Sequence, residues 1–351
     1  MRFIHCADIH LDSVMKNLKE GKAKERKDEL RLSFEKMIVA ARENGVKAII
    51  IAGDMFDSKT VSTKTKNYIT DLFAEYSDID FLYLSGNHDE QNIMTGICEK
   101  LNNVYFLSEN PIVYDNICIY GFKPTSESSY DALTFDKNNV NIVVMHGQVD
   151  DYNCSKDYVN LKKLKGKNID YLALGHIHYF SEYRLDERGV AVYSGCLEGR
   201  GFDEIGQKGF VALEVKDNKI NYSFNAFSRR VLYEIKVDIT NKQTVKEIDN
   251  EIISSVKDID AGNLVKVVLC GNVNVETEKD IEHFEKILND RFYFAKVKDE
   301  TKLLIDIEKV KNDISLKGEF VKRVLESNLT QESKERIIRF GIKALNGEEI
   351  E

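Results

Sequence analysis

Short apolar runs and segments with helical periodicity alternate through the first 230 residues. Five runs of strand length occupy residues 3–7, 48–52, 81–85, 140–145 and 169–174. Successive residues within each run are apolar, which is typical of strands covered on both faces. Between the first two runs, one helical face is formed by Leu30, Phe34, Met37, Ile38 and Ala41. Gly45 follows as a candidate C-terminal cap, and the whole pattern predicts a layered α/β domain.

The pattern changes near residue 229, where alternate residues from Val231 to Ile239 become apolar, as in a half-exposed strand. Further runs predict a helix, a strand, a helix and two strands, at residues 245–256, 264–270, 281–288, 292–297 and 303–307. Two helices, near residues 316–325 and 331–345, follow. The 351 residues exceed the roughly 250 to 300 at which single cores stop growing. We therefore predict a large domain at residues 1–228, a smaller α/β domain at 229–310 and C-terminal helices at 311–351.

Polar motifs follow the predicted strands of the first domain. They are Asp8-Ile9-His10, Gly53-Asp54, Gly86-Asn87-His88-Asp89, His146-Gly147 and Gly175-His176-Ile177-His178. Ligands of layered α/β sheets bind beyond the carboxyl ends of strands, so these distant motifs can converge. Each motif is weak by itself, because core histidines and N-capping aspartates are common. The ordered set of five is a strong signal.

The spacing of these motifs favours a metal site. Residues i and i+2 of an extended segment project from one side, roughly 6 to 7 Å apart. Asp8 with His10, and His176 with His178, can therefore address two ions about 3.5 to 4 Å apart. Asp54 is the natural bridging ligand, because its carboxylate has two oxygens. Mixed carboxylate, amide and imidazole donors suit Mn²⁺, Fe or Zn²⁺ better than Mg²⁺ or Ca²⁺.

These motifs resemble those of the calcineurin-like metallophosphoesterases. More narrowly, they are similar to the SbcD and YhaO-type DNA exonucleases of bacteria, relatives of the nuclease subunit of the double-strand-break repair complex. The matching runs are residues 2–13, 53–57, 199–204 and 208–210. The resemblance implies a metallophosphoesterase sandwich of two mixed β-sheets flanked by helices, with a smaller α/β capping domain and C-terminal helices. Beyond residue 230 it rests on the order of the elements alone.

Site residues follow from the resemblance position by position. One metal would be held by Asp8, His10, Asp54 and His178. The second would be held by Asp54, Asn87, His146 and His176. His88 would protonate or orient the leaving oxygen, with Asp89 supporting it. A metal-bridging hydroxide would attack phosphorus in line. One departure is Ser194-Gly195-Cys196, which stands where the family usually has Pro-Gly-Ser.

The resemblance also implies an activity and partners. We expect a two-metal-dependent phosphodiesterase, an exonuclease or endonuclease, acting on DNA in repair with two divalent ions, most readily Mn²⁺. An SMC-like ATPase would dock through the C-terminal helices, although their apolar stripes could equally pack on their own domain. Whether the chain also forms a homodimer is left open by the sequence. The alternatives are a phosphodiesterase or phosphatase acting on a small nucleotide or phosphoester, and a non-catalytic scaffold of a repair complex.

Charge and cysteine usage limit these interpretations. The net charge of −9 opposes polyanion binding, but the basic clusters at residues 22–31 and 162–167 could form patches. They could equally be ordinary solvated faces. No apolar run approaches the roughly 18 residues of a membrane span. Six scattered cysteines without a CxxC pair predict reduced thiols in the cytoplasm, with Cys196 inert. We expect a structural or supporting role for His5 and a surface position for His283.

Overall fold

The computed structural model describes residues 1–15, 18, 20–57, 61–86, 91–155, 157–274, 277–304 and 314–345. The chain forms two compact units, Met1–Val231 and Leu232–Glu351. The predicted boundaries at residues 228 and 310 stay a prediction. Among the described residues, none of the helices combines the length and apolar character needed to cross a bilayer.

The first unit is a sandwich of two six-stranded mixed sheets. The first sheet has the order β14 (Lys219–Ala226), β13 (Gly209–Lys216), β1 (Arg2–Cys6), β2 (Ala48–Ala52), β3 (Asp80–Leu84) and β4 (Val104–Phe106). The second has the order β11 (Ser181–Arg184), β12 (Val190–Tyr193), β10 (Tyr171–Gly175), β7 (Val140–His146), β6 (Ile117–Gly121) and β5 (Ile112–Tyr114). Strands β1 to β4 are parallel to one another, as are β6, β7, β10 and β12.

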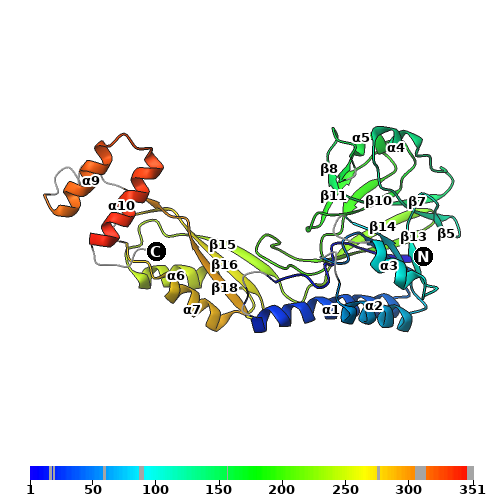
Figure 1. Ribbon diagram of the computed structural model, residues 1–351, viewed down its shortest axis with the longest axis horizontal. Helices are drawn as coiled ribbons and strands as arrows, with labels where there is room; N and C mark the ends of the chain where they lie inside the picture. The colour runs from blue at the N-terminus through cyan, green and yellow to red at the C-terminus, as the bar shows by residue number, and fades with distance from the viewer. Residues whose placement is uncertain are drawn as a thin grey trace. The chain divides into compact units, whose positions relative to one another are not determined.

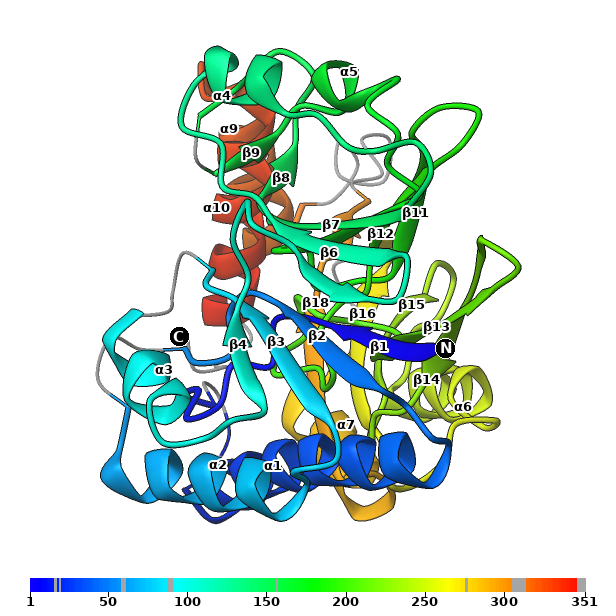
Figure 2. The same cartoon turned by 90° about the vertical axis from the view of Figure 1, so that its right-hand side faces the viewer.

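Three apolar layers hold this unit together. Between the sheets, Ile50 and Leu82 belong to the same buried cluster as Ile142 and Val144. Helices α1 (Glu20–Glu43), α2 (Thr63–Glu75) and α3 (Gln91–Cys98) pack on the outer face of the first sheet. Helices α4 (Glu127–Ala132) and α5 (Leu161–Leu164) pack on the outer face of the second, as Figure 2 shows. The predicted two-sheet sandwich flanked by helices is confirmed. Its central strands are buried on both faces.

The predicted helix around residues 30–41 is the second half of α1, which begins ten residues earlier than its apolar face suggested. It ends as predicted. Gly45 has a φ of 62°, which L side chains rarely adopt, and the Val46 N–H donates to the Ala41 carbonyl at 2.9 Å. Two short strands outside the main sheets, β8 (Gln148–Val149) and β9 (Tyr158–Val159), pair in parallel.

The second unit contains a parallel sheet with the order β15 (Leu232–Asp238), β16 (Leu264–Cys270) and β18 (Phe294–Asp299). Helices α6 (Val245–Ser255) and α7 (Ile281–Arg291) share its apolar core (Figure 1). A small parallel pair, β17 (Asn272–Val273) and β19 (Lys302–Leu303), lies beside it. The strand predicted at residues 303–307 lies outside the described residues from 305 onward. His283 is on α7 and pairs with Asp249 at 2.8 Å.

Two C-terminal helices, α9 (Leu316–Glu326) and α10 (Gln331–Leu345), form where they were predicted. They pack on each other through Val321, Val324, Ile338 and Ile342. The apolar stripes are therefore partly used within this unit, which was one of the two open alternatives.

Candidate metal centre

The polar motifs converge at the carboxyl ends of strands from both sheets. Asp8 and His10 follow β1, and Asp54 follows β2. His146 is the last residue of β7, and His176 and His178 follow β10. Three further predicted site residues, Asn87, His88 and Asp89, lie outside the described residues.

Two groups of ligand atoms are each close enough to hold one cation. One group is Asp8, His10 and His178, and the other is Asp8, Asp54 and His146; within each, the candidate ligand atoms lie within 4.8 Å of one another. Asp8 belongs to both groups, whereas the resemblance implied Asp54 as the shared ligand. Two adjacent three-residue groups with a common carboxylate are an arrangement suited to a pair of divalent ions.

His176 stands beside these groups without belonging to either. Its backbone N–H donates to both Asp8 carboxylate oxygens, at 3.1 and 2.9 Å. Its ring centroid lies 5.4 Å from that of His146. Burial lowers the pKa of His176, and the nearby His146 lowers it further, which favours the neutral imidazole that a metal requires. Its role as a ligand stays a prediction.

The imidazoles of both groups are oriented through their Nδ1 atoms. His146 Nδ1 donates to the Ala52 carbonyl at 2.9 Å, and His178 Nδ1 lies 2.7 Å from a Glu204 oxygen. His10 Nδ1 lies 3.3 Å from an oxygen of Asp57. A proton fixed on Nδ1 leaves the Nε2 lone pair for a cation. The Nε2 atoms of His10 and His178 indeed face each other at 3.3 Å, so the donor set fits a metal.

Backbone strain marks the same residues. Asp8, His10 and Asp54 have φ values of 50°, 50° and 51°, and His176 has a φ of 103°. Each such conformation costs on the order of 1–3 kcal/mol for a residue other than glycine. Two backbone hydrogen bonds hold it in place, from Asp8 N–H to the Gly53 carbonyl at 3.1 Å and from His10 N–H to the Asp54 carbonyl at 3.0 Å.

Glycines allow the close approach of these segments. A Cβ atom on Gly53 would collide with the His146 ring, and one on Gly86 would collide with the Asp54 carboxylate. The glycines in the Gly-Asp and Gly-Asn-His-Asp motifs therefore make room for ligands from other strands.

Asp57, Arg200 and Glu204 support the site, and the sequence reasoning gave none of them a role. Arg200 Nη2 donates to Glu204 at 2.6 Å, and Arg200 Nη1 lies 3.3 Å from Asp57. Burial raises the pKa of Glu204, but the hydrogen bonds from His178 and Arg200 outweigh it and bring the pKa to about 2. The hydrogen bond from His10 is the main reason that the pKa of Asp57 lies far below its usual value. The signal was available, because these residues lie in the matching runs 53–57 and 199–204.

Burial and charge act in opposite directions on His146. Burial lowers its pKa, but the neighbouring Asp54 and Asp8 carboxylates outweigh burial and raise the pKa to about 9. Before a cation binds, this imidazole therefore carries a proton on both ring nitrogens at neutral pH. A metal must displace that proton.

Two other buried groups near these strands behave as structural residues. His5 Nδ1 lies 3.0 Å from the Tyr171 hydroxyl within the core, and burial lowers the pKa of His5 to about 3. Burial also raises the pKa of the Cys196 thiol well above its ordinary value, so the thiol is a poor nucleophile. Gly195, in the run that replaces Pro-Gly-Ser, has a φ of 74°.

The first basic cluster is not a surface patch throughout. Arg26 is buried, and its guanidinium donates to Glu29, to Glu198 at 3.1 Å and to the Gly199 carbonyl at 2.7 Å. Both interpretations of residues 22–31, a basic patch and a solvated face, are therefore wrong for Arg26. In the second cluster, Lys163 pairs with Glu127, which reduces its field.

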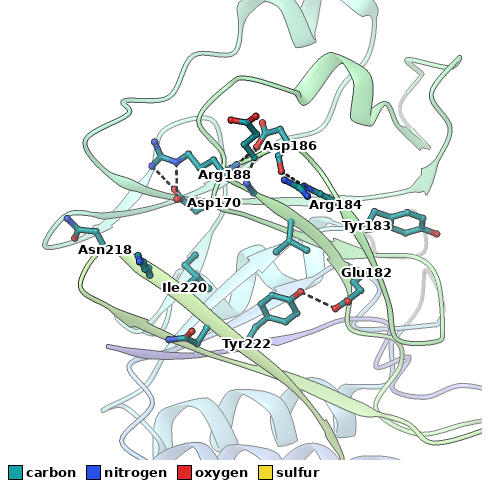
Figure 3. Close-up of a pocket in the computed structure, with 14 residues that line it drawn as sticks. Asp170, Glu182, Tyr183, Arg184, Asp186, Arg188, Asn218, Ile220 and Tyr222 are labelled. Carbon is teal, nitrogen blue, oxygen red and sulfur yellow. Dashed lines mark hydrogen bonds and ion pairs between the residues drawn. The ribbon is translucent and has the colours of Figure 1, made fainter.

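A groove of about 690 Å³ lies elsewhere on the first unit (Figure 3). Asp170 and Val190, which line it, stand at the amino ends of β10 and β12, opposite to the candidate ligands. Arg188 donates to both oxygens of Asp170, at 2.9 and 2.8 Å. Arg188 and Asp170 neutralise each other, and we assign no chemistry to this groove.

Comparison with known proteins defines the class to which this fold and site belong. Residues 1–180 match the family model described as calcineurin-like phosphoesterase. The chain belongs to this family, whose members use a dinuclear metal site.

The individual proteins that the chain resembles share low sequence identity with it. The uncharacterized metallophosphoesterase YhaO of Bacillus subtilis is 28% identical over 77% of this chain and 72% of its own length. The DNA double-strand break repair protein Mre11 of Methanosarcina acetivorans is 28% identical over 58% of this chain but 35% of its own length. Mre11 of Sulfolobus acidocaldarius is 24% identical over 79% and 77%. A dimetal phosphatase structure from Danio rerio has a TM-score of 0.38 at 11% identity, over 63% of this chain and 98% of its own.

Proposed function

We propose that this chain is a two-metal phosphodiesterase that cleaves DNA, as an exonuclease or endonuclease in DNA repair. The observation that carries the proposal is the pair of ligand groups sharing Asp8 at the carboxyl edge of both sheets. Family membership supports phosphoester hydrolysis. Relatives named as double-strand break repair proteins support DNA as the substrate.

In this proposal, different residues bind the cations, orient the metal ligands and act on the leaving group. Asp8, His10 and His178 would hold one cation, and Asp8, Asp54 and His146 would hold the other. Bound cations would neutralise charge on the phosphoryl group and lower the pKa of a water molecule. Glu204 and Asp57 keep the imidazoles oriented. His88 would protonate or orient the leaving oxygen, a role that rests on the sequence resemblance alone.

Mn²⁺ is our proposed metal, because the site combines imidazole nitrogens with carboxylate oxygens. DNA carries many negative charges, and a chain with a net charge of −9 needs bound cations to attract it. We therefore expect DNA binding to depend on the metal.

The test uses linear single- and double-stranded DNA and bis-p-nitrophenyl phosphate, each with Mn²⁺. The wild-type chain should cleave all three, and Asp54→Asn should cleave none. Asp170→Asn, which alters a paired carboxylate at the other ends of the strands, is the matched control and should retain activity. Cleavage of the small ester alone would move the assignment to a phosphodiesterase of small substrates.

An SMC-like ATPase partner is the second part of the proposal. Val321 and Val324 are buried between α9 and α10, so they are not available for docking. Ile314 and Leu316 are exposed, at 98% and 73% of their surface, at the start of α9. A partner would cover this end of the helix pair. Co-purification of the ATPase with the wild-type chain, but not with Leu316→Asp, would support this surface.

A further inference from the structure

The contact between the two sheets at the metal centre is repeated one strand further along. At the centre, His146 from the end of β7 reaches Asp54 after β2. On the neighbouring strands, Lys123 follows β6 and its ammonium donates to the hydroxyl of Ser85, which follows β3. Gly121 pairs with Val144 in the register of β6 and β7, so Lys123 stands level with His146. Neighbouring strands are about 4.8 Å apart. Lys123 therefore lies beside His146 and the metal centre.

A groove of about 560 Å³ opens at this point. Its lining includes Ser85, Phe106, Ser108, Asn110 and Lys123. Phe106, at the end of β4, exposes 37% of its surface, and its ring stands edge-to-face on the buried Tyr83 at 5.7 Å. The contact with Tyr83 thus holds the Phe106 ring in place, and the rest of the ring is open to the solvent. The volume lies within the roughly 300–1,000 Å³ of small-ligand sites.

The base of the groove is built by a close backbone contact. Gly121 N–H donates to the Ser108 carbonyl at 2.8 Å. A Cβ atom on Gly121 would lie 2.6 Å from the Leu107 Cβ, so a larger residue would push β4 and β6 apart. The groove is therefore a consequence of how the two sheets meet.

We infer that this groove is a nucleotide subsite next to the metal centre. Phe106 stacks on a nucleobase, and Lys123 with Ser85 binds the phosphate adjoining the one that is cleaved. This inference rests on the proposed function and names the part of the substrate that the site recognises, a nucleoside phosphate.

The chemistry of the lining fits such a ligand. Every base has a π-face, so a fixed aromatic ring binds any of them with little sequence preference. Lysine binds phosphate as a point charge. Asn110 offers hydrogen bonds to a base edge, whereas Glu109, also in the lining, disfavours phosphate at that end. The phosphate therefore binds at the Lys123 end of the groove, which is the end nearer the metal centre.

Two p-nitrophenyl esters provide the first test. One is thymidine 5′-(p-nitrophenyl phosphate), which carries a nucleoside, and the other is bis-p-nitrophenyl phosphate, which does not. We expect Phe106→Ala to lower the ratio of kcat/KM for the nucleoside ester to that for the bis ester about tenfold. Phe106→Tyr should preserve the ratio, and so should Lys123→Ala, because neither ester carries the second phosphate that Lys123 binds. Tyr105→Ala is the matched control, because Tyr105 is the equally exposed neighbour on β4 and is outside the groove.

A binding test separates failure of the subsite from failure of the proposed function. The chain has no tryptophan, so Phe106→Trp introduces a single fluorescent reporter. Thymidine 5′-monophosphate should quench it saturably, inorganic phosphate alone should not, and adding Lys123→Ala should weaken the binding several-fold. Absence of saturable quenching, or an unchanged substrate ratio in Phe106→Ala, would overturn the inference. Quenching without hydrolysis of any ester would retain the subsite and reject the phosphodiesterase.

Discussion

Removing the Glu204 carboxylate should weaken metal binding without unfolding the protein. Glu204 is buried, and one of its oxygens lies 2.7 Å from His178 Nδ1. Its charge keeps the Nδ1 proton in place and makes Nε2 a better donor to a cation. Arg200, a second partner of Glu204, keeps another carboxylate at 3.3 Å in Asp57. The arginine is therefore still paired after the substitution.

The size of the effect follows from this hydrogen bond. A hydrogen bond to a charged group is worth about 1.5–3 kcal/mol and a neutral one about 0.5–1.5 kcal/mol. Glu204→Gln keeps a neutral acceptor, so the loss should be about 1 kcal/mol, or about fivefold in affinity. Glu204→Ala removes the acceptor and should cost about 10- to 100-fold.

Mn²⁺ titration calorimetry measures this series, with circular dichroism and thermal unfolding recorded in chelator to verify the fold. Asp170→Asn, at the opposite ends of the strands, should leave the affinity unchanged. Equal affinity in wild type, Glu204→Gln and Glu204→Ala, each fully folded, would refute the role of Glu204 in positioning His178.

Three further predictions concern the site and its support. Gly86→Ala should displace the Asp54 carboxylate and lower metal content measured by mass spectrometry, whereas Gly96→Ala, with nothing within 4 Å of its added Cβ, should not. The apparent Mn²⁺ affinity should fall as pH drops below about 9, because His146 then holds a proton that the metal must displace. Calorimetry in buffers of different ionisation enthalpy should detect its release, and no release at neutral pH would contradict the prediction. Arg26→Ala should destabilise the chain by about 1.5–3 kcal/mol in urea unfolding, because Glu198 loses its guanidinium partner while Glu29 keeps Arg229 and Arg230; a loss under 1 kcal/mol would argue against that network.

The central strands and the location of the site were predictable for the same physical reason. Parallel strands covered on both faces are apolar throughout, so their ends stand out wherever a polar motif begins. Asp8, Asp54 and His146 each follow such a run or end it. Because ligands bind beyond the carboxyl ends of parallel strands, the convergence of these residues follows from the order of apolar runs and polar motifs alone.

The β13–β14 hairpin was not predicted, although its strands are each eight residues long. Its turn residues, Asp217 and Asn218, have φ values of 51° and 58°. Both residues tolerate the left-handed region, but the turn lacks the glycine that marks such hairpins most clearly. The strand β14 is half exposed, so its apolar signal was also weak.

Supporting residues were missed because their partners are remote in sequence. Glu198 accepts hydrogen bonds from Arg26, Ser33 and the Arg229 N–H, which come from α1 and from the end of the first unit. Nothing in the local pattern of α1 distinguishes Arg26 from its solvated neighbours, since its burial depends on a residue 172 positions away. The Gly199 carbonyl, which Arg26 also binds, directly precedes Arg200. The helix that covers the first sheet therefore also anchors the loop that orients His178, and selection on the metal centre would extend to residues that no ligand motif contains.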